Sequence, residues 1–569
     1  MSAKNFLYIL MVLQCLKGLA QESNTSLTYE QVISKYKALD SLYTEAKLML
    51  YGRTDCGKNL HLFILSATGD FDIHSIHAQK KCVLLINNGI HPGEPDGIDA
   101  SVQLATDLLT RPDMKKLLKN VVVCIVPVFN IDGALERGCC VRVNQNGPEQ
   151  YGFRGNAKNL DLNRDFMKDD SQNTISLLSI LHGWDPDLFI DTHVSDGADY
   201  QYSMSLISSQ HSKMSPPLGE LMKHKITPEL FKKMREKKDD MTPYVNTMDG
   251  IEVPDSGLVA FLESPRFLSG YMSLFNALPF ISESHMLKPF ETRKKSTYNL
   301  LLSLIEVGGE YHSKILEARA AANSYDENQK TFFFNYKLDT TKKERILFRG
   351  YEAGYKQSAV TGNMRLFYDR EKPYEKEIDF YDSYFPTDSI HIPKYFIIPQ
   401  AYYNYVHLLD KNSIICIRNY EDSSVNAEVT YIESYETVRS PYEGHYLHYD
   451  IKTRREKQTI TIHTGDYIVP LPQKGIRFVL EALVPSSCDS YFAWGFFDSW
   501  LQQKEGFSPY VFEDIASGLI SGDEQLRENY ESWLKVNQHS TDYEKLNFIY
   551  QHSPYFEKSY CRYPIYSVN

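Results

Sequence analysis

Apolar runs alternate with amphipathic stretches between about residues 80 and 300. Residues 81–88, which contain the apolar run 82–86, and residues 121–128 have the length and composition of buried strands, and shorter strand-like segments follow at 188–191 and 279–281. Residues 96–119 carry apolar side chains at helical spacing, and residues 173–181 also favour a helix. Buried strands that alternate with helices predict an α/β domain whose mixed, mostly parallel sheet is flanked by helices on both faces.

The pattern changes after about residue 325. Residues 330–475 contain short alternating runs rich in Tyr, Thr, Val and Ile, such as 395–398 and 458–463, which predict a β-sandwich or a β-rich insert. The last residues mix a strand-like run at 478–484 with a helical stretch at 525–536. We therefore expect a catalytic domain at 25–325, a β-rich domain at 326–475 and a mixed α/β region at 476–569. The sequence leaves open whether region 476–569 packs on the first domain.

The amino terminus has the pattern of an export signal. Lys4 precedes a short apolar run at 6–16, and Gly18-Leu19-Ala20 supplies small residues for cleavage. The run is too short to span a bilayer, and no later segment reaches the ~20 apolar residues of a membrane helix. A lipid anchor at Cys15 is disfavoured because Gln14 is not small. We expect residues 1–20 to be a signal peptide and the mature protein to be soluble and exported, either secreted or periplasmic.

Composition narrows the possible partners. The 569 residues carry a net charge of −12, which argues against nucleic-acid or anionic-membrane binding. Eight of the nine cysteines follow the predicted signal, and Cys139-Cys140 is conspicuous. Their spacing contains neither a Cys-x-x-Cys pair nor a zinc-ribbon pattern, so it does not define the disulfide pairing.

Candidate metal ligands follow the first buried strand. His91-Pro92-Gly93-Glu94 places an imidazole and a carboxylate three residues apart, directly after the apolar run at 82–86. Zinc accepts nitrogen and carboxylate oxygen together. The His-x-x-Glu spacing alone is common, so it needs a third ligand and a base elsewhere.

Two further polar residues follow other predicted strands. His193 follows the run at 188–191, and Glu283 follows the run at 279–281. Ligands of open α/β sheets bind beyond the carboxyl ends of the strands, so His91, His193 and Glu283 are expected to share one edge. Two histidines and one carboxylate leave a position open for water, as in a catalytic zinc site. Asp191 lies two residues before His193 and could orient it.

A loop rich in Gly and Asn lies between these strands. It contains Arg154, Asn156, Asn163 and Arg164, whose planar donors suit carboxylates and oxyanions. Arginines in a loop are usually solvated, but their place between site-bearing strands favours recognition of a substrate.

Taken together, these blocks resemble the M14 family of zinc metallocarboxypeptidases, the carboxypeptidase A-like fold. The match rests on His91-Pro92-Gly93-Glu94, Asn130-Ile131-Asp132-Gly133, Asp161-Leu162-Asn163-Arg164 and the separate His193 and Glu283, and it covers about residues 30–310. The chain departs from the family at the substrate-capping tyrosine. That residue is expected about two dozen positions before the base, where this sequence has Phe261-Leu262-Glu263, and Tyr271 lies closer than expected.

The resemblance implies a role for each residue. His91, Glu94 and His193 would bind one zinc ion, and Glu283 would be the general base. Asn163 and Arg164 would bind the terminal carboxylate of the substrate, and Arg154 would stabilise the oxyanion.

The sequence thus predicts an exported zinc carboxypeptidase acting on peptides with a free carboxylate. Two alternatives remain at this level. The same metal site could serve an amidase of cell-wall peptides or a deacylase of acyl-amino acids. The second alternative is a non-catalytic binding protein, although a protein that only binds its ligand does not need a general base such as Glu283.

Overall fold

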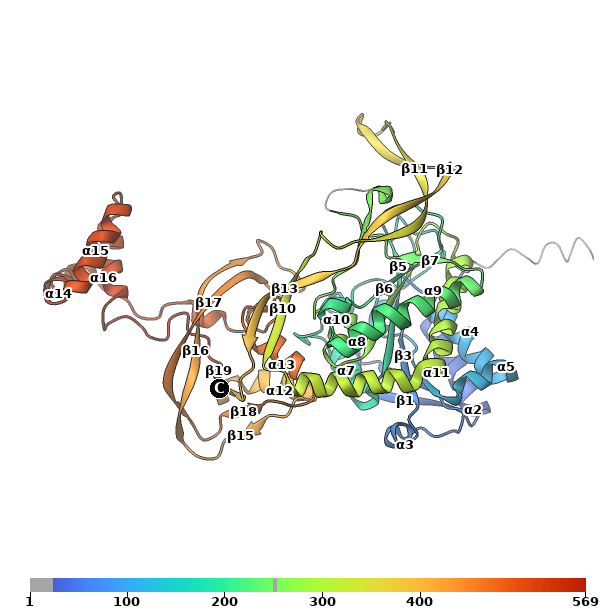
Figure 1. Ribbon diagram of the computed structural model, residues 1–569, viewed down its shortest axis with the longest axis horizontal. Helices are drawn as coiled ribbons and strands as arrows, with labels where there is room; N and C mark the ends of the chain where they lie inside the picture. The colour runs from blue at the N-terminus through green and yellow to red at the C-terminus, as the bar shows by residue number, and fades with distance from the viewer. Residues whose placement is uncertain (1–23, 249–252) are drawn as a thin grey trace, which may run out of the picture.

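The computed structural model describes residues 24–248 and 253–569, so the predicted signal peptide at 1–20 lies outside the described residues. A mixed eight-stranded sheet forms the centre of the first domain (Figure 1). Its strand order is β1-β2-β4-β3-β5-β9-β6-β7. The inner strands β4, β3, β5 and β9 are parallel to their neighbours in this group. The strands are β1 Ala46–Arg53, β2 Asn59–Leu65, β3 Cys82–Asn87, β4 Val121–Val126, β5 Leu188–Ser195, β6 Met204–Ser208, β7 Met241–Pro243 and β9 Leu278–His285.

Helices cover this sheet. The long α11 packs against α4 and against β3, β4 and β9, while α7 packs against β1 and β2. The main helices are α2 Tyr29–Leu42, α4 Asp96–Thr110, α7 Gln172–Trp184, α8 Pro216–Leu221, α9 Thr227–Glu236, α10 Leu268–Leu274 and α11 Phe290–Asn328. Strands β3 and β4 are completely buried, which explains their unbroken apolar sequence. The predicted α/β fold with a mostly parallel sheet is confirmed.

The predicted helix at 96–119 is interrupted. Helix α4 ends at Thr110, and a separate short helix α5, Pro112–Lys115, follows before a 3₁₀ turn at Lys116–Lys119. Pro112 has no backbone N–H and disfavours a helical conformation at Arg111, so the helix stops there.

Strands dominate the region after α11, as predicted, but they form separate sheets of two, three and six strands. Two long hairpins shape it (Figure 1): β11 with β12, and β16 with β17. The strands after α11 are β10 Thr331–Leu338, β11 Glu344–Gln357, β12 Met364–Tyr381, β13 Tyr384–His391, β14 Tyr395–Ile398, β15 Ile417–Arg418, β16 Ser423–Thr437, β17 His448–Ile462, β18 Tyr467–Pro470 and β19 Tyr566–Val568, and the three-stranded sheet also contains β8, Leu258–Val259, from the first domain. The hairpin β11–β12 reaches the first domain, because β12 pairs with β8.

The strand predicted at 478–484 is wrong. These residues belong to helix α13, Ile476–Leu483, and every residue of that helix is buried. A short apolar run gives no period that separates a buried helix from a buried strand. Helix α13 packs against α10 and α11, so this part of the last region contacts the first domain.

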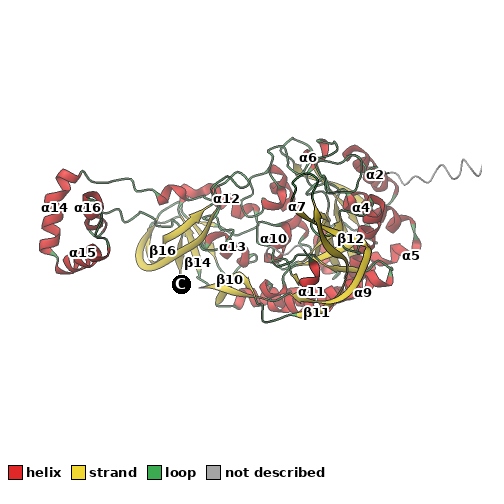
Figure 2. Ribbon diagram, turned by 90° about the horizontal axis from the view of Figure 1, so that it is seen from above, coloured by secondary structure: helices red, strands yellow, loops and turns green. Residues whose placement is uncertain are grey.

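Three helices near the carboxyl terminus stand apart. Helices α14 Pro509–Gly522, α15 Glu524–Val536 and α16 Asp542–Gln551 share a small core of their own. Figures 1 and 2 both show them at the far end of the molecule. The predicted domain limits at 325 and 475 stay predictions; they fall near the end of α11 and just before α13.

None of the helices in the described ranges is both long and apolar enough to pass through a membrane.

Arg319 links helix α11 to the turn that precedes strand β5. Its Nη1 donates to Asp187 Oδ1 at 2.9 Å, and Asp187 Oδ2 accepts from the Val83 N–H of β3 at 2.9 Å. Arg319 also pairs with Asp185. Burial opposes ionisation of Asp185, but Arg319 and Lys474 outweigh it and lower its pKa to about 2.

Replacing Arg319 with methionine is expected to lower the free energy of unfolding by about 3–5 kcal/mol at pH 7, because Asp187 stays buried without its partner. The folded-state pKa of Asp185 is depressed, so its contribution is present above its unfolded pKa and is lost as the pH falls toward 2. Melting curves at pH 7 and pH 3 should therefore show a smaller gap between wild type and variant at pH 3. Lys314→Met, an exposed position on the same helix, is the control. An unchanged gap at pH 3 would contradict the ion-pair explanation.

Candidate metal centre and active site

The first two candidate ligands lie in a tight turn after β3. The Glu94 N–H donates to the His91 carbonyl oxygen at 2.9 Å, which brings both side chains to the same side of the turn. His91 Nδ1 and Glu94 Oε1 are 3.4 Å apart, and both side chains are 3% exposed. Helix α4 starts close to β5 at this point: a Cβ on Gly97 would lie 2.0 Å from Thr192 Oγ1, so only glycine fits. This close packing fixes the turn against β5.

His193 completes the cluster from β5. Its Nδ1 lies 3.0 Å from Glu94 Oε2, and its ring centroid is 4.9 Å from that of His91. One ligand atom from each of His91, Glu94 and His193 lies within 4.8 Å of the other two, and all three residues are buried. The structure therefore brings the three predicted ligands together.

Each histidine of the cluster is held by a carboxylate at its far nitrogen. His91 Nε2 lies 2.9 Å from Asp161 Oδ1, and His193 Nε2 lies 3.0 Å from Asp191 Oδ2. These contacts leave both Nδ1 atoms for the centre of the cluster, and His91 Nδ1 is buried without a hydrogen-bond partner. Carboxylate–histidine pairs of this kind fix the ring orientation of metal ligands. The donor set and the unpartnered nitrogen fit a zinc ion.

Neighbouring charges act strongly on the ligand cluster. Burial opposes ionisation of Glu94, but Arg142, His91 and His193 outweigh it and hold its pKa well below its usual range. Burial likewise opposes protonation of His193, but Asp191 and Glu94 raise its pKa well above the usual value. Positive charge is therefore favoured between these side chains, and a metal ion would take the place of the proton on His193.

Glu283 lies beside His193 on the neighbouring strand. The parallel pairing of β5 and β9 places His193 opposite Glu283, so both side chains project from the same face. Burial, followed by the charges of Glu94 and Asp196, raises the pKa of Glu283 to about 8. A bound cation would lower this pKa again, because positive charge favours the carboxylate.

One expectation about position needs correction. His193 and Glu283 do not follow their strands; they lie inside β5 and β9, which continue to Ser195 and His285. Both strands end in polar residues, so the apolar runs in the sequence are shorter than the strands themselves. The two side chains still reach the same site as His91, which lies beyond the end of β3.

The predicted recognition loop borders the cluster. Arg154 donates through Nε to Asp161 Oδ2 at 3.0 Å, and its Nη1 lies 3.7 Å from Glu94 Oε1. Asn163 Nδ2 is 3.5 Å from His193 Nε2. Arg164 donates to the Asn163 carbonyl oxygen at 2.8 Å and stacks over the Phe267 ring at 4.1 Å. All three predicted binding residues therefore lie next to the ligand cluster or to one another.

The carboxyl-terminal region contacts the same loop. Glu443 Oε2 accepts a hydrogen bond from the Asp161 N–H at 2.8 Å, and His445 Nε2 lies 2.7 Å from Asp170 Oδ2. Asp161 also orients His91, so a residue from the second part of the chain supports the metal cluster through one intermediate group. Sequence reasoning gave no sign of this contact, since it spans 282 residues.

Two residues at the site were missed. Arg142 Nη1 lies 2.9 Å from Glu94 Oε1, just after a disulfide between Cys139 and Cys140. Burial, followed by the nearby charge of Glu283, raises the pKa of Tyr244 well above its usual value. Neither residue has a local sequence signal, because Arg142 lies in an irregular loop and Tyr244 follows the very short strand β7.

Tyr271 is a structural residue. It is completely buried, and its hydroxyl lies 2.7 Å from His182 Nε2. This agrees with leaving it out of the predicted site.

One family model matches part of the chain. Residues 32–193, which include the three candidate ligands, match the family model described as zinc carboxypeptidase. No curated protein matches the chain.

Among solved structures, the chain is similar to a metallo-carboxypeptidase from Burkholderia cenocepacia (18% identity, 50% of this chain, 70% of that chain, TM-score 0.37). It is also similar to a metallo-carboxypeptidase from Pseudomonas aeruginosa (15% identity, 51% and 70%, TM-score 0.37). A third is the carboxypeptidase A from Helicoverpa armigera (15% identity, 56% and 82%, TM-score 0.39).

Proposed function

We propose that this protein is a zinc-dependent metallocarboxypeptidase that removes carboxyl-terminal residues from peptides, with Glu283 as the general base. Residues 32–193, which include the three candidate metal ligands, match the family model described as zinc carboxypeptidase. The observation that supports this most is the convergence of His91, Glu94 and His193 beside Glu283 on one face of the sheet.

Each side chain has a defined task in this proposal. His91, Glu94 and His193 hold one zinc ion, which when bound polarises the scissile carbonyl and lowers the pKa of water. Glu283 takes a proton from the attacking water and passes it to the leaving amine. Arg154 provides positive charge for the oxyanion, from a place held by Asp161 and next to Glu94.

Asn163 and Arg164 give the proposal its selectivity for chain ends. Both are held in place before substrate arrives: Asn163 Oδ1 accepts from the Leu268 N–H at 3.0 Å, and Phe267 supports the Arg164 guanidinium. A fixed planar guanidinium suits a carboxylate. We infer that they bind the free carboxylate and so restrict cleavage to the last peptide bond.

Replacing Arg164 with lysine is expected to raise KM by about 10- to 100-fold and to change kcat little, because lysine cannot offer two parallel donors to the carboxylate. Steady-state kinetics on a peptide with a free carboxyl terminus will measure both constants. Arg365→Lys, in the exposed part of hairpin β11–β12, is the control. A lower kcat at unchanged KM would contradict the binding role.

A panel of substrates tests the reaction class. The zinc-loaded protein should release single carboxyl-terminal residues from a mixed peptide library and should lose this activity with a chelator. Release of cell-wall peptides from muropeptides, or of acyl groups from acyl-amino acids, with intact peptides left uncleaved, would replace the proposal by an amidase or a deacylase. Zinc binding with no hydrolysis of any substrate would indicate a binding protein.

We further propose that the protein is exported. The support is the charged start, the short apolar run at 6–16 and the small residues before Gln21. Expression of the full chain in a secreting host should yield extracellular or periplasmic protein whose first residue lies near Gln21. Retention of Met1 in protein recovered from the cytoplasm would refute the export proposal.

A further inference from the structure

The outer half of hairpin β11–β12 rises away from the body of the molecule (Figure 1). Strand β11 is an outer strand of its three-stranded sheet, and β8 pairs only with the end of β12 at the base of the hairpin. On the free side of β11, the Gln201 N–H donates to the Arg349 carbonyl oxygen at 3.1 Å, and contact ends with a bridge at Gly350. Within the described residues, no strand pairs with this side of residues 352–357.

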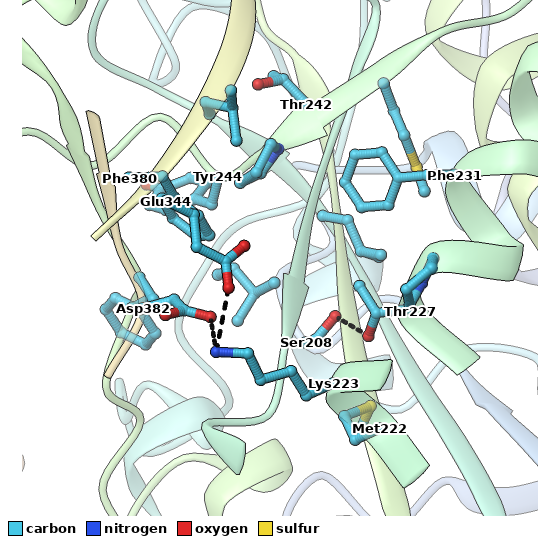
Figure 3. Close-up of a pocket in the computed structure, with 18 of the residues that line it drawn as sticks. Ser208, Met222, Lys223, Thr227, Phe231, Thr242, Tyr244, Glu344, Phe380 and Asp382 are labelled. Atoms are coloured by element: carbon cyan, nitrogen blue, oxygen red, sulfur yellow. Dashed lines mark hydrogen bonds and ion pairs between the residues drawn. The ribbon is translucent and has the colours of Figure 1, made fainter. Parts of the chain in front are cut away.

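The base of the hairpin is fixed to the first domain. Lys223 donates to Asp382 Oδ2 at 2.8 Å and lies 3.3 Å from Glu344, so one lysine holds the start of β11 and the end of β12 (Figure 3). Arg370 on β12 also donates through Nε to Asp199 Oδ2 at 2.6 Å. Because its base is held, the outer half points in a fixed direction, which lowers the entropy cost of binding another molecule.

The outer edge of β11 offers backbone groups at alternate residues. In an antiparallel pair, the N–H and C=O groups of successive residues point alternately toward the neighbouring strand and away from it. The Ser358 N–H donates across the hairpin to the Asn363 carbonyl oxygen at 2.8 Å, whereas the Arg349 carbonyl oxygen accepts on the outer side. Even-numbered residues of β11 therefore bond to β12, and Ala353 and Tyr355 turn their backbone groups outward. An edge of this kind is a template for a further strand.

The charges along this edge are self-complementary. Glu352, Gly354 and Lys356 project from the same face, because side chains alternate along a strand. Antiparallel pairing of the edge with its own copy, with Gly354 at the two-fold axis, puts Glu352 of each copy opposite Lys356 of the other. Lys356 lies 4.8 Å from the Phe367 ring, and no carboxylate of the described residues pairs with it. Glu352 lies 3.2 Å from Lys376 of its own chain and is 48% exposed, so it can accept a second cation.

The same register also satisfies the backbone. It pairs Ala353 of one copy with Tyr355 of the other, and both residues turn their N–H and C=O groups outward. A shift by one residue would bring outward groups opposite inward ones. A lysine on an edge strand usually prevents pairing, because two copies bring like charges together. Here Glu352 lies opposite Lys356, so the pairing gains from the charge instead.

The other face of the hairpin tip is apolar. Tyr355 is 64% exposed and Met364 is 63% exposed, and Leu366 lies opposite Tyr355 within the hairpin. In the antiparallel register, the Tyr355 side chains of the two copies are diagonal neighbours, a separation that aromatic side chains can span. Pairing therefore also removes apolar surface of the tip from water.

We propose that two copies of this chain associate through the outer edges of β11, in an antiparallel pair with Gly354 at the two-fold axis. The two hairpins then form one four-stranded ribbon, and the same residues of both copies make the contact, as in other two-fold dimers. Only residues 352–357 of each copy take part, so the contact is smaller than the roughly 1,200 Å² of standard interfaces and the dimer is weak and reversible. The metal site and the proposed reaction have no part in it.

Sedimentation velocity of the full chain over a range of concentrations tests the association. We expect a reversible dimer with a Kd of roughly 1–100 μM, as for other small contacts. Lys356→Glu and Glu352→Lys should each raise this Kd about tenfold or more, because two opposite-charge pairs become two like-charge pairs. Lys452→Glu makes the same charge change at an exposed position on hairpin β16–β17 and is the control that should keep the wild-type Kd.

An equimolar mixture of the two edge variants separates charge pairing from damage to the hairpin. In a mixed pair, one copy carries two carboxylates at positions 352 and 356 and the other carries two lysines, so both opposite-charge contacts return. The mixture should therefore associate about as tightly as the wild type, although each variant alone does not. Substitutions that merely disturb the hairpin would not recover on mixing, and that result would overturn the proposal.

Ala353→Pro tests the backbone pairing. Proline removes an N–H that points outward, so the hairpin keeps its own hydrogen bonds while the pairing with the copy is blocked. We expect loss of the dimer at an unchanged melting temperature. Wild-type protein that stays monomeric up to about 1 mM would overturn the proposal. A monomer that releases carboxyl-terminal residues from peptides would refute the dimer and leave the proposed function intact.

Discussion

Replacing Glu283 with glutamine is expected to lower kcat by about 10⁴-fold while zinc stays bound. The amide keeps the size of the side chain but cannot accept a proton from water, and the same carboxylate also serves the leaving amine. Glu283 is not among the three clustered ligands, so the metal should remain. Steady-state kinetics together with the zinc content of the purified variant will measure both effects.

The control for this variant is another buried glutamate. Burial raises the pKa of Glu481 on α13 to about 7, and it lies outside the active site. Glu481→Gln should therefore change stability at most, and kcat should stay near that of the wild type. A Glu283→Gln protein with more than about a tenth of wild-type activity would show that another group is the base.

Replacing His91 with alanine is expected to weaken zinc binding by more than about 100-fold, the upper range for loss of an orienting partner alone. The change removes one of the three gathered ligand atoms and leaves Asp161 without its imidazole partner. Hydrolysis at limiting zinc should fall in parallel. Zinc titration with a competing chelator will measure the affinity.

Asp161→Asn separates ligation from orientation. It keeps His91 in place but weakens the contact to its Nε2, so we expect a smaller loss of affinity, about 10- to 100-fold. His77→Ala, at an exposed position on the short helix Ile73–Ala78, is the surface control. Equal zinc affinity in His91→Ala and wild type would remove His91 from the metal site.

The metal cluster could be predicted because each ligand is tied to a local sequence pattern. His91 and Glu94 follow a completely apolar strand, and His193 and Glu283 stand within two others. In a parallel sheet, adjacent strands end at the same edge, so three separate segments converge without any knowledge of distant contacts.

Contacts of the second half of the chain could not be predicted in this way. Glu443 reaches Asp161 and hairpin β11–β12 reaches β8 through long-range packing that leaves no periodic trace. Arg142 and Tyr244 lie in irregular segments for the same reason. Helix α13 was mistaken for a strand because all eight of its residues are buried, which removes the polar face that marks a helix.

Crystals of the protein soaked with zinc would test the central claim most directly, through an anomalous difference map at the zinc absorption edge. The account predicts one strong peak enclosed by His91 Nδ1, His193 Nδ1 and the Glu94 carboxylate, next to Glu283. A map without a peak there, or with its strongest peak at other side chains, would contradict it.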